Sequence, residues 1–458
     1  MMNKEFFAGK NVLVMGLGRF GGGVDVAKFA ANAGGKVTVT DLAPAAKLND
    51  SLKQLEEFTE IEYRLGSHDA TDFKQADIIV VNPAVPPDNE FLQIARRHNK
   101  LITSQINIFF ELCSAQVIGI TGANGKSTTA ALTAHLLRAG HGQKGFKYSN
   151  VWLSGNIGNE PLLAIIDQIS TDDLVVLELS SFQIEQLAQI QKAPKVALLT
   201  NLTPNHLDRY GTFADYCKAK ENIFKLQKLD KNRPAVSVFD AEDKIGVGWF
   251  EKYKKEAGRI CIKFSTDDVS KEIRKQFGLP GRANLSNLAA AVSIARYFGV
   301  EDDWIRRCLP EFRPLPHRLE LAAEINGVKW YNDSKATTPQ SAIASLEAFE
   351  QPVIIIAGGY DKNLPFDELG KTIAQKAKAA ILIGQTAEKI TKAIKEDKST
   401  RTQAHKATNL LEAVNLAKHL AASGDVVLLS PACASYDMFD NFEHRGREFV
   451  KLVQEISS

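Results

Sequence analysis

Short apolar runs rich in β-branched residues recur along the chain, separated by stretches with helical character. They are NVLVMG (11–16), KVTVTD (36–41), ADIIVV (76–81), AQVIGIT (115–121), DLVVLEL (173–179), KVALLTN (195–201), PVIIIAGG (352–359), AAILIG (379–384) and DVVLLSP (425–431). Continuous apolar runs of this length suit strands that are buried on both faces. Strands that alternate with helices predict an α/β protein with parallel sheets.

The runs fall into three groups, and at about 150 residues per domain a chain of 458 residues predicts three domains. The first group ends near residues 101–103, and the second extends from Gln116 to a helical stretch over 287–298. A proline-rich segment, LPEFRPLPHRLE, follows and reads as a linker, because proline stops helices and stiffens loops. We therefore expect domains at 1–104, 105–313 and 314–458.

Composition excludes several classes of protein. A net charge of +2 gives no strong preference for nucleic acid or an anionic membrane. The five cysteines are scattered and form no CxxC pair, which favours a reducing compartment. The N-terminus lacks the apolar core of a signal peptide, and no apolar run approaches the ~20 residues of a membrane span. We expect a cytoplasmic protein, and a monomer.

The clearest chemical motif is VIGITGANGKSTTAALTAHLL, in which a strand leads through a glycine-rich turn into an amphipathic helix. Gly122 and Gly125 allow the backbone to aim its N–H groups at phosphate oxygens, and the helix start adds partial positive charge. Lys126 is expected at the β- and γ-phosphates, and Ser127 at Mg²⁺. The strict GxxxxGK[ST] pattern fails by one position, because Ile120 replaces its first glycine. A plain strand–helix turn with a surface lysine is the alternative.

A second glycine-rich loop lies near the N-terminus. Residues 16–21, GLGRFG, match GxGxxG in full, and Asp41 ends the next strand 20 residues after Gly21. This spacing is typical of a dinucleotide-binding unit, in which the acid binds a ribose hydroxyl. It predicts an NAD-dependent oxidoreductase, a site for another nucleotide diphosphate such as a UDP-sugar, or a structural turn. The phosphate loop downstream argues against the oxidoreductase.

Polar groups follow two further strands of the middle group. Glu178 ends a buried strand, where a carboxylate faces the crevice in which α/β sheets bind ligands, and Mg²⁺ prefers oxygen ligands. Ser180, Ser181 and Gln183 follow it closely. His206 lies in the loop after the strand that ends at Asn201, and is a candidate metal ligand or substrate-orienting group. A solvated acid and an uninvolved loop histidine are the alternatives.

Together, GANGKST, ELSSFQ, HLDRYGTF, PHRLE, NDSKATT, GGYDKNLPF and SPACASYDMFDNFEHRG resemble the Mur ligases, in the family's order from about Gly16 to Phe449. The resemblance implies an N-terminal Rossmann-like UDP-binding domain, a central P-loop ATPase-like domain and a C-terminal Rossmann-like domain that binds an amino acid. It implies ATP, two Mg²⁺ ions and a carbamylated lysine. It also implies a ligase that adds D-glutamate to UDP-N-acetylmuramoyl-L-alanine through an acyl phosphate, in peptidoglycan precursor synthesis.

The resemblance assigns site residues by position. For ATP it implies Gly122, Ala123, Asn124, Gly125, Lys126, Ser127, Thr128, Asn287, Arg318 and Asp333. For the metal ions it implies Ser127, Glu178, His206 and a modified lysine. That lysine is read as Lys220, with Lys218 as the fallback. For catalysis it implies Lys126, His206 and Lys220. For the UDP-substrate it implies Gly18, Arg19, Phe20, Asp41, Asn82, Asn156, Ser180 and Gln183. For the amino acid it implies Lys335, Thr337, Lys362, Ser435 and Phe442.

Three alternatives remain at this point. The first is a sister ligase of the same mechanism with another amino acid, including folate polyglutamylation. No DNPR-like motif of the diaminopimelate-adding enzyme occurs, and the KATT and SPACAS segments favour D-glutamate. The second is the oxidoreductase, and the third is a non-catalytic nucleotide-binding switch. The chain departs from the family's usual pattern at Leu42, Ala84 and Asn205 and in the glycine-rich segment RFGGGVDV, so the details of the UDP pocket around Phe20, Leu42 and Ala84 stay open.

Overall fold

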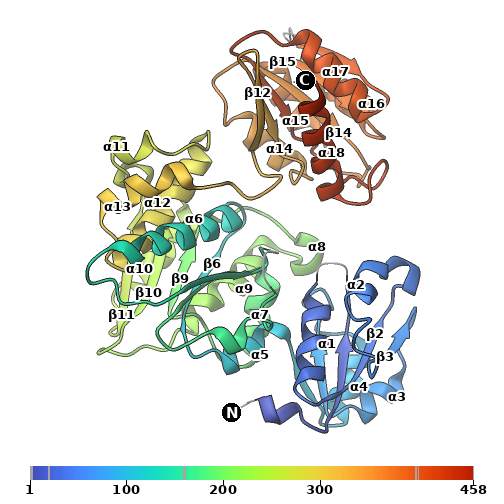
Figure 1. Ribbon diagram of the computed structural model, residues 1–458, viewed down its shortest axis with the longest axis vertical. Helices are drawn as coiled ribbons and strands as arrows, with labels where there is room; N and C mark the ends of the chain where they lie inside the picture. The colour runs from blue at the N-terminus through green and yellow to red at the C-terminus, as the bar shows by residue number, and fades with distance from the viewer. Residues whose placement is uncertain (1–3, 19–20, 158–160, 398–399, 401, 457–458) are drawn as a thin grey trace. The chain divides into compact units, whose positions relative to one another are not determined.

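The computed structural model describes residues 4–18, 21–157, 161–397, 400 and 402–456 (Figure 1). The chain forms two compact units, one of Met1–Ile273 with Asn287–Cys308 and the other of Arg274–Ser286 with Leu309–Ser458. Short 3-10 helices lie at Lys4–Phe7, Ala45–Lys47, Gly140–Gly142, Ile166–Gln168, Thr266–Asp268 and Leu309–Glu311. Within the described residues, no helix is both long and apolar enough to cross a bilayer.

The first unit contains two parallel sheets, and the N-terminal one has five strands. Their order is β3 (Glu62–Leu65), β2 (Lys36–Asp41), β1 (Asn11–Met15), β4 (Ile78–Val81) and β5 (Leu101–Thr103). The helices are α1 (Gly22–Asn32), α2 (Asn49–Lys53), α3 (Ala70–Gln75), α4 (Glu90–Arg97) and α5 (Gln105–Leu112). The central strand β1 is flanked on both sides, which explains its uninterrupted apolar sequence.

The second sheet of this unit has six parallel strands. Their order is β11 (Arg259–Phe264), β10 (Ala235–Asp240), β9 (Val196–Leu199), β6 (Gln116–Thr121), β8 (Leu174–Glu178) and β7 (Val151–Gly155). The helices are α6 (Lys126–Ala139), α7 (Ser181–Gln189), α8 (Leu207–Tyr210), α9 (Phe213–Lys225), α10 (Lys244–Tyr253), α11 (Lys271–Arg274), α12 (Arg282–Tyr297) and α13 (Asp302–Cys308).

The second unit is built on a third sheet. Its strand order is β12 (Glu320–Ile325), β13 (Val328–Asn332), β17 (Val426–Leu429), β14 (Val353–Gly358), β15 (Ala377–Ile383) and β16 (Gln403–Lys406). The helices are α14 (Pro339–Leu346), α15 (Asp367–Lys376), α16 (Ala387–Glu396), α17 (Leu410–Leu420) and α18 (Phe442–Glu455). The expectation of parallel strands is wrong at one edge, because β12 and β13 form an antiparallel hairpin. Its two-residue turn, Asn326-Gly327, has positive φ at both positions, as tight hairpins require.

The α/β fold predicted from the sequence is confirmed, and the nine predicted strand segments all contain strands. Burial explains why they read as continuous apolar runs. All residues of β4, β8, β9, β14 and β17 are buried. One apolar cluster includes side chains from both sheets of the first unit, among them Val14 and Leu177. The third sheet is covered by a separate cluster on each face.

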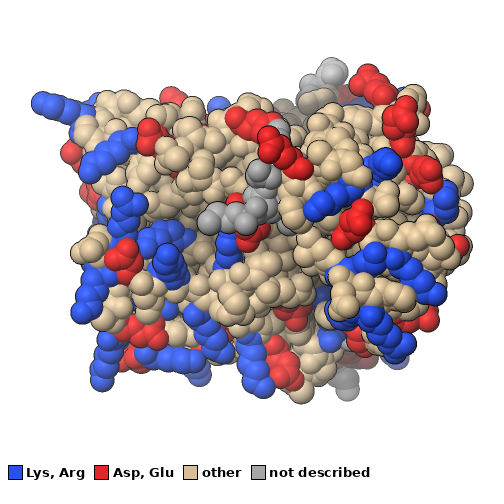
Figure 2. Space-filling view, turned by 90° about the horizontal axis from the view of Figure 1, so that it is seen from below, with Lys and Arg blue, Asp and Glu red and all other residues tan. Residues whose placement is uncertain are grey.

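Charged side chains are spread over the surface. On the face drawn in Figure 2, basic and acidic side chains are interspersed with neutral ones. This agrees with the near balance of 56 basic and 54 acidic residues in the whole chain. This balance gives no strong net field that would attract nucleic acid.

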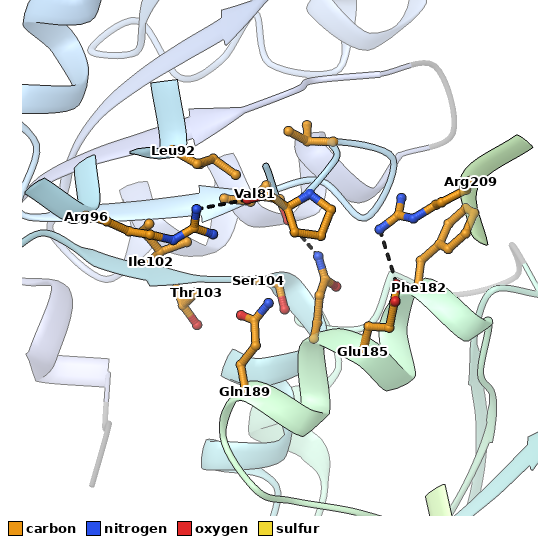
Figure 3. Close-up of a pocket in the computed structure, with 13 residues that line it drawn as sticks. Val81, Leu92, Arg96, Ile102, Thr103, Ser104, Phe182, Glu185, Gln189 and Arg209 are labelled. Atoms are coloured by element: carbon orange, nitrogen blue, oxygen red, sulfur yellow. Dashed lines mark hydrogen bonds and ion pairs between the residues drawn. The ribbon is translucent and has the colours of Figure 1, made fainter. Parts of the chain in front are cut away.

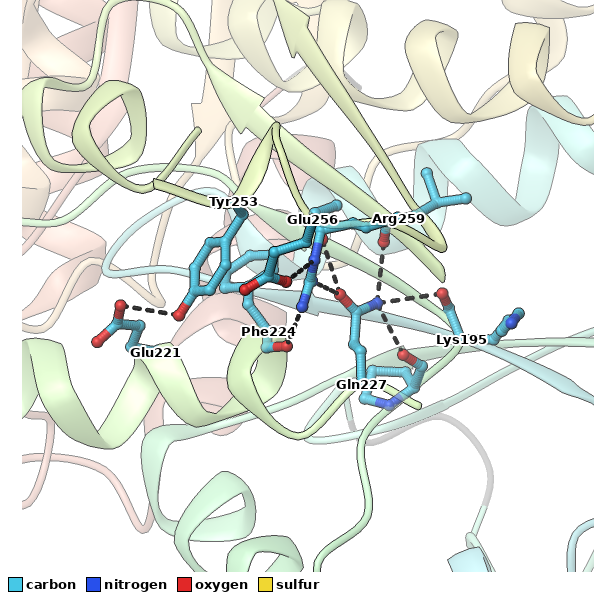
Figure 4. A network of polar contacts seen from close by, with 10 residues as sticks. Lys195, Glu221, Phe224, Gln227, Tyr253, Glu256 and Arg259 are labelled. Carbon is cyan, nitrogen blue, oxygen red and sulfur yellow. Dashed lines mark hydrogen bonds and ion pairs between the residues drawn. The ribbon is translucent and has the colours of Figure 1, made fainter. Parts of the chain in front are cut away.

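A buried polar network joins β10, β11 and the end of α9 (Figure 4). The Gln227 amide donates to the backbone oxygens of Pro194, Lys195 and Val236, and its oxygen accepts from Ser237 and Arg259. The Arg259 guanidinium also donates to the Phe224 carbonyl at 3.0 Å. Such a network is stabilising only while every member keeps its partner.

Replacing Gln227 by Ala is expected to lower the free energy of unfolding by roughly 2–5 kcal/mol, because it leaves several buried polar groups without partners. Urea unfolding followed by circular dichroism measures the effect. The exposed neighbour Lys228→Ala is the matched control and is expected to change stability by less than about 0.5 kcal/mol. Equal stability of the two variants would contradict this account.

Candidate active site

The loops of the second sheet converge because its strands are parallel. Strands β9, β6, β8 and β7 are neighbours in that order, so their carboxyl ends lie along one edge. The phosphate loop follows β6, Glu178 ends β8, Asn201 follows β9 and Asn156 follows β7. This edge is where open α/β sheets bind ligands. The structure therefore brings together the loops that the sequence singled out.

The turn at residues 122–128 approaches its neighbours too closely for side chains. A Cβ on Gly122 would lie 1.9 Å from the Thr200 hydroxyl, and one on Gly125 would lie 2.2 Å from the Asn287 side-chain oxygen. Both glycines have positive φ, at 150° and 79°. Helix α6 begins at Lys126, so the backbone N–H groups of its first turn and the positive end of its dipole lie at the turn, as an anion site requires.

Two asparagines and a threonine fix this turn from other elements. The Asn201 side chain accepts from the Asn124 N–H at 3.0 Å, and the Thr200 hydroxyl donates to the Asn124 carbonyl at 2.6 Å. Asn287 is 8% exposed and accepts from the Thr129 hydroxyl at 3.2 Å. The structure thus places Asn287, a predicted ATP residue, against the phosphate loop. The Lys126 ammonium donates to the Ala123 carbonyl at 2.8 Å, within the loop itself.

Glu178 connects the phosphate loop to the loop after β7. Its carboxylate is buried, and it accepts from the Ser127 hydroxyl at 2.5 Å and from the Asn156 amide at 3.1 Å. Three predicted site residues from three neighbouring loops therefore meet in one cluster. A carboxylate and a hydroxyl are hard oxygen donors, which is the ligand chemistry that Mg²⁺ prefers.

Lys220 lies beside this cluster, on α9. Its side chain is 1% exposed, and its amine donates to the Thr121 hydroxyl at 3.0 Å. Burial lowers the pKa of Lys220 well below its usual value, and the nearby charge of Lys126 lowers it further, against the opposing effect of Glu178. A neutral amine is therefore favoured. The fallback, Lys218, is exposed and forms an ion pair with Asp215 at 2.9 Å, so it lies away from the cluster.

His206 lies on the same edge but outside the buried cluster. It is exposed, adopts a left-handed conformation with φ of 52°, and precedes α8. Its ring lies 5.0 Å from that of Phe182 and 6.2 Å from that of Tyr216. The Lys220 amine lies 5.1 Å from the centre of the same Tyr216 ring. Both predicted groups of the second metal site therefore contact Tyr216.

Among the described residues, no group of three or more His, Cys, Asp or Glu side chains is placed to hold a metal ion by itself. The Ser127–Glu178 pair nevertheless fits a Mg²⁺ ion whose other ligands are ATP phosphates and waters, because Mg²⁺ is commonly bound by one or two carboxylates plus substrate oxygens. The residues present thus fit the first expected ion.

Two predicted UDP-substrate residues, Ser180 and Gln183, bind each other. The Ser180 hydroxyl accepts from the Gln183 N–H, and the Gln183 oxygen accepts from the Ser180 N–H at 3.0 Å. This capping box satisfies N-terminal donors of α7. It explains the polar residues after Glu178 in structural terms.

Three further predicted UDP-substrate residues, Gly18, Asp41 and Asn82, lie at the carboxyl ends of β1, β2 and β4 in the first sheet, whereas Asn156 follows β7 of the second. The Asp41 carboxylate accepts from the Gly18 N–H at 3.0 Å, and the Asn82 amide donates to the Gly16 carbonyl at 3.4 Å. A Cβ on Gly16 would lie 2.9 Å from the Cβ of Asn82. Arg19 and Phe20 lie outside the described residues.

Arg209 joins this sheet to the His206 loop, beside a narrow pocket between α4 and α7 (Figure 3). Its guanidinium donates to the Pro83 carbonyl at 2.9 Å, pairs with Glu185 at 3.3 Å and lies 3.9 Å from the centre of the Phe182 ring. Pro83 directly follows Asn82. Sequence reasoning noted Arg209 only as part of the loop and gave it no role.

The predicted amino-acid residues lie on loops after three neighbouring strands of the third sheet. Lys335 and Thr337 follow β13, Ser435 follows β17 and Lys362 follows β14. Phe442 begins α18, and the Lys335 amine lies 5.3 Å from the centre of its ring. Ser435 is 2% exposed, whereas Lys362 is exposed.

Asp333 and Arg318, the remaining predicted ATP residues, also belong to the second unit. Asp333 follows β13 and accepts from the Ser345 hydroxyl, from the Ser430 hydroxyl at 2.8 Å and from the Leu319 N–H at 3.2 Å. Burial raises the pKa of Asp333 to about 6, although these hydrogen bonds and the charge of Arg318 oppose the rise.

Sequence reasoning missed two groups that the structure places beside these sites. Thr121 accepts from Lys220, and Arg445 is buried beneath the loops that carry Lys335 and Ser435. A signal for Arg445 exists in the sequence, because Arg445, Phe449 and Leu452 recur at helical spacing on the buried face of α18.

Comparison with known proteins agrees with this arrangement. Residues 10–104 match the MurD-like N-terminal domain of Mur ligases, 120–277 the Mur ligase middle domain, and 317–433 the Mur ligase glutamate ligase domain. A protein from Roseiflexus sp. (strain RS-1) named UDP-N-acetylmuramoylalanine--D-glutamate ligase is 39% identical, over 98% of this chain and 99% of the relative. One of the same name from Acetivibrio thermocellus is 38% identical, over 99% and 98%.

Solved structures show the same fold. UDP-N-acetylmuramate-alanine ligase MurC from Thermotoga maritima superposes with a TM-score of 0.58 at 20% identity, over 98% of this chain and 100% of that one. MurF ligase from the same organism, in complex with ADP, superposes with a TM-score of 0.57 at 18% identity, over 100% of this chain and 98% of that one.

The chain therefore belongs to the Mur ligase family. Family models match its N-terminal, middle and glutamate ligase segments in that order. Within the family it is a MurD-like member, as its N-terminal segment and its full-length relatives show.

The raised pKa of Asp333 predicts a pH dependence of stability. Because the folded value of about 6 exceeds the ordinary value of 3.8, the stability that protonated Asp333 contributes is present below pH ~4 and is lost as the pH rises through ~6. The loss is of the order of 3 kcal/mol. Asp333→Asn is expected to remove this slope from urea unfolding measured between pH 4 and 7.

Asp367→Asn, at an exposed position in the same unit, is the matched control and is expected to keep the wild-type slope. If Asp333→Asn and the wild type lose stability in parallel over this range, the assignment of the slope to Asp333 is wrong.

Proposed function

We propose that this chain is an ATP-dependent ligase that adds D-glutamate to UDP-N-acetylmuramoyl-L-alanine in peptidoglycan precursor synthesis. The observation that carries the proposal is the cluster at the carboxyl edge of β6 and β8, where the phosphate loop, Glu178 and buried Lys220 come together. Full-length relatives named for this activity supply the substrates. The GxGxxG segment lies inside the MurD-like N-terminal match, which argues against the oxidoreductase alternative.

The reaction begins with transfer of a phosphoryl group. The L-alanine carboxylate of the nucleotide sugar attacks the γ-phosphate of ATP, and ADP leaves. Residues 122–128 bind the phosphates through their backbone N–H groups, and Lys126 neutralises charge on the transferring group, which is how phosphoryl transfer is mainly catalysed. The D-glutamate amine then attacks the acyl phosphate and phosphate leaves. His206 is the candidate base for this amine.

Metal ions would be held by residues of this cluster. Ser127 and Glu178 would bind the first Mg²⁺, and His206 and carbamylated Lys220 the second. When bound, the ions would supply charge stabilisation for the phosphoryl and acyl oxygens. Burial lowers the pKa of Lys220 and so favours its neutral form, which supports carbamylation because only a neutral amine adds CO₂, and the resulting anion suits a cation site.

The remaining groups are assigned to substrates. Gly18, Arg19, Phe20, Asp41 and Asn82 are proposed to bind the UDP end, with Asn156 nearer the reacting carboxylate. Arg318, Asp333 and Asn287 are proposed for ATP, and Lys335, Thr337, Lys362, Ser435 and Phe442 for D-glutamate. Two lysines suit a dicarboxylate, because each carboxylate favours a paired cation. We further infer three functional domains at 1–104, 105–313 and 314–458, a cytoplasmic location and a monomer.

The amino-acid specificity separates this proposal from a sister ligase. Inorganic phosphate release from ATP and UDP-N-acetylmuramoyl-L-alanine is expected to require D-glutamate. It is expected to fall at least about 100-fold with L-glutamate or meso-diaminopimelate, because misplaced carboxylates leave buried donors unpaired. Equal stimulation by another amino acid, or release that needs no amino acid, would reject the assignment in favour of a sister ligase or a nucleotide switch.

Lys126→Ala is expected to abolish ADP formation, with a loss of at least about 1,000-fold in kcat, because it removes the cation nearest the transferring phosphoryl group. The exposed Lys218→Ala on α9 is the matched control and should retain ADP formation. Coupled ADP detection measures both. Normal turnover of Lys126→Ala would refute the role of the loop.

A further inference from the structure

Arg445 is a buried arginine that forms no ion pair among the described residues, and the charge of Asp437 acts on it only from beyond ion-pair distance. It belongs to α18, is 1% exposed and is among the largest fully buried side chains of the chain. Its guanidinium donates to the Ser334 hydroxyl at 3.0 Å and to three backbone carbonyls, those of Ser334 at 2.9 Å, Cys433 at 3.1 Å and Ala434 at 3.3 Å. All four acceptors are neutral.

Burial of a charged guanidinium in this position carries a large desolvation penalty. Desolvation lowers the pKa of Arg445 to about 10, so the group still carries its charge at neutral pH. The charge of Asp437 and the four neutral acceptors offset this desolvation only in part, and an apolar side chain of similar size would be buried there more favourably. A purely structural role therefore does not account for the choice of arginine.

The acceptors identify what the guanidinium holds. Ser334 directly precedes Lys335 in the loop after β13, and Ala434 directly precedes Ser435 in the loop after β17. The Ala434 carbonyl also accepts from the Tyr360 N–H at 2.9 Å, which connects the loop after β14. Arg445 and Phe442 share α18. One side chain thus holds together the loops that carry the proposed amino-acid ligands.

We propose that Arg445 is the positioning residue of the amino-acid site. Its planar guanidinium holds the Lys335 and Ser435 loops in register with Phe442, and its positive charge adds to that of Lys335 and Lys362 in attracting a dicarboxylate. The rigid fork of arginine suits this task, because it reaches several carbonyls from one plane, whereas the lysine ammonium is a single point. The inference rests on the proposed function and concerns only the amino-acid substrate.

Steady-state phosphate release by the full-length enzyme tests the proposal. Arg445→Lys keeps the charge but loses the fork, and is expected to raise the KM for D-glutamate about tenfold, whereas Arg445→Gln is expected to raise it about 100-fold. The KM values for ATP and for UDP-N-acetylmuramoyl-L-alanine are expected to stay within about twofold of wild type, because the neighbouring Asp333, proposed for ATP, is held independently by Ser345 and Ser430. Partial recovery by lysine relative to glutamine is part of the expected result.

Two further variants keep the test decisive. Ser334→Ala removes one acceptor and leaves the arginine in place, and is expected to raise the KM for D-glutamate about threefold. Arg447→Gln changes an exposed arginine on the same helix and is expected to leave all three KM values unchanged. If Arg445→Gln does not fold, Arg445→Lys and Ser334→Ala decide the question.

The proposal is overturned if Arg445→Lys and Ser334→Ala leave the KM for D-glutamate at its wild-type value. It is also overturned if all three KM values rise together, or if only the thermal midpoint falls, since either result indicates a general structural role. A wild-type enzyme that fails to respond to D-glutamate would instead reject the proposed function, so the two failures are distinguishable.

Discussion

Parallel pairing of β6 with both β8 and β9 is the constraint from which the candidate site follows. Because the three strands run in the same direction, the phosphate loop, Glu178 and the Asn201 loop must all emerge at one edge. The close approach of the Asn201 loop then excludes a side chain at Gly122, and Asn287 of α12 excludes one at Gly125. Sheet topology thus decides which groups meet, and the parallel strands of the first and third sheets do the same for the residues proposed to bind the other substrates.

Lys220 and Arg445 are both buried basic side chains, and desolvation affects them in different ways. Lys220 can lose its charge, because burial and Lys126 both favour the neutral amine, and a neutral amine is open to chemistry. Arg445 keeps its charge and disperses it over four neutral oxygens. The titrating side chain lies where a reactive group is proposed, and the non-titrating one lies where fixed loops are needed.

The sequence predicts most of the fold, and for physical reasons. Strands buried on both faces leave an apolar signature, and parallel order then brings the chemistry-bearing loops to one edge. The β12–β13 hairpin was not predicted, because the edge strand β12 has no buried residue and Lys329 interrupts the apolar run of the mostly buried β13. The Gln227–Arg259 network was not predicted, because its residues lie far apart along the chain and no local sequence pattern indicates that they contact one another.

The position of a residue at a strand end predicted whether it lies near the candidate site. The sequence did not predict which side chains are buried there. Lys218 and Lys220 are the same residue type two positions apart. Helix α9 nevertheless buries Lys220 on the face that carries Tyr216 and Phe224, and leaves Lys218 in solvent. The roles of individual residues are proposals. A motif predicts which side chains lie at the carboxyl edge of a sheet, but it does not identify the ligand that each one binds. Arg445 illustrates this limit, since it matters through the backbones it holds.

The contact between Asn287 and the phosphate loop has a consequence for synthesis of the chain. The Thr129–Asn287 hydrogen bond spans 158 residues, and the loop glycine at 125 is shaped to fit the same asparagine. A ribosome delivers the loop long before it delivers α12, so the nucleotide pocket stays unfinished while the intervening strands are made. The proposed nucleotide site is thus complete only after α12 has emerged.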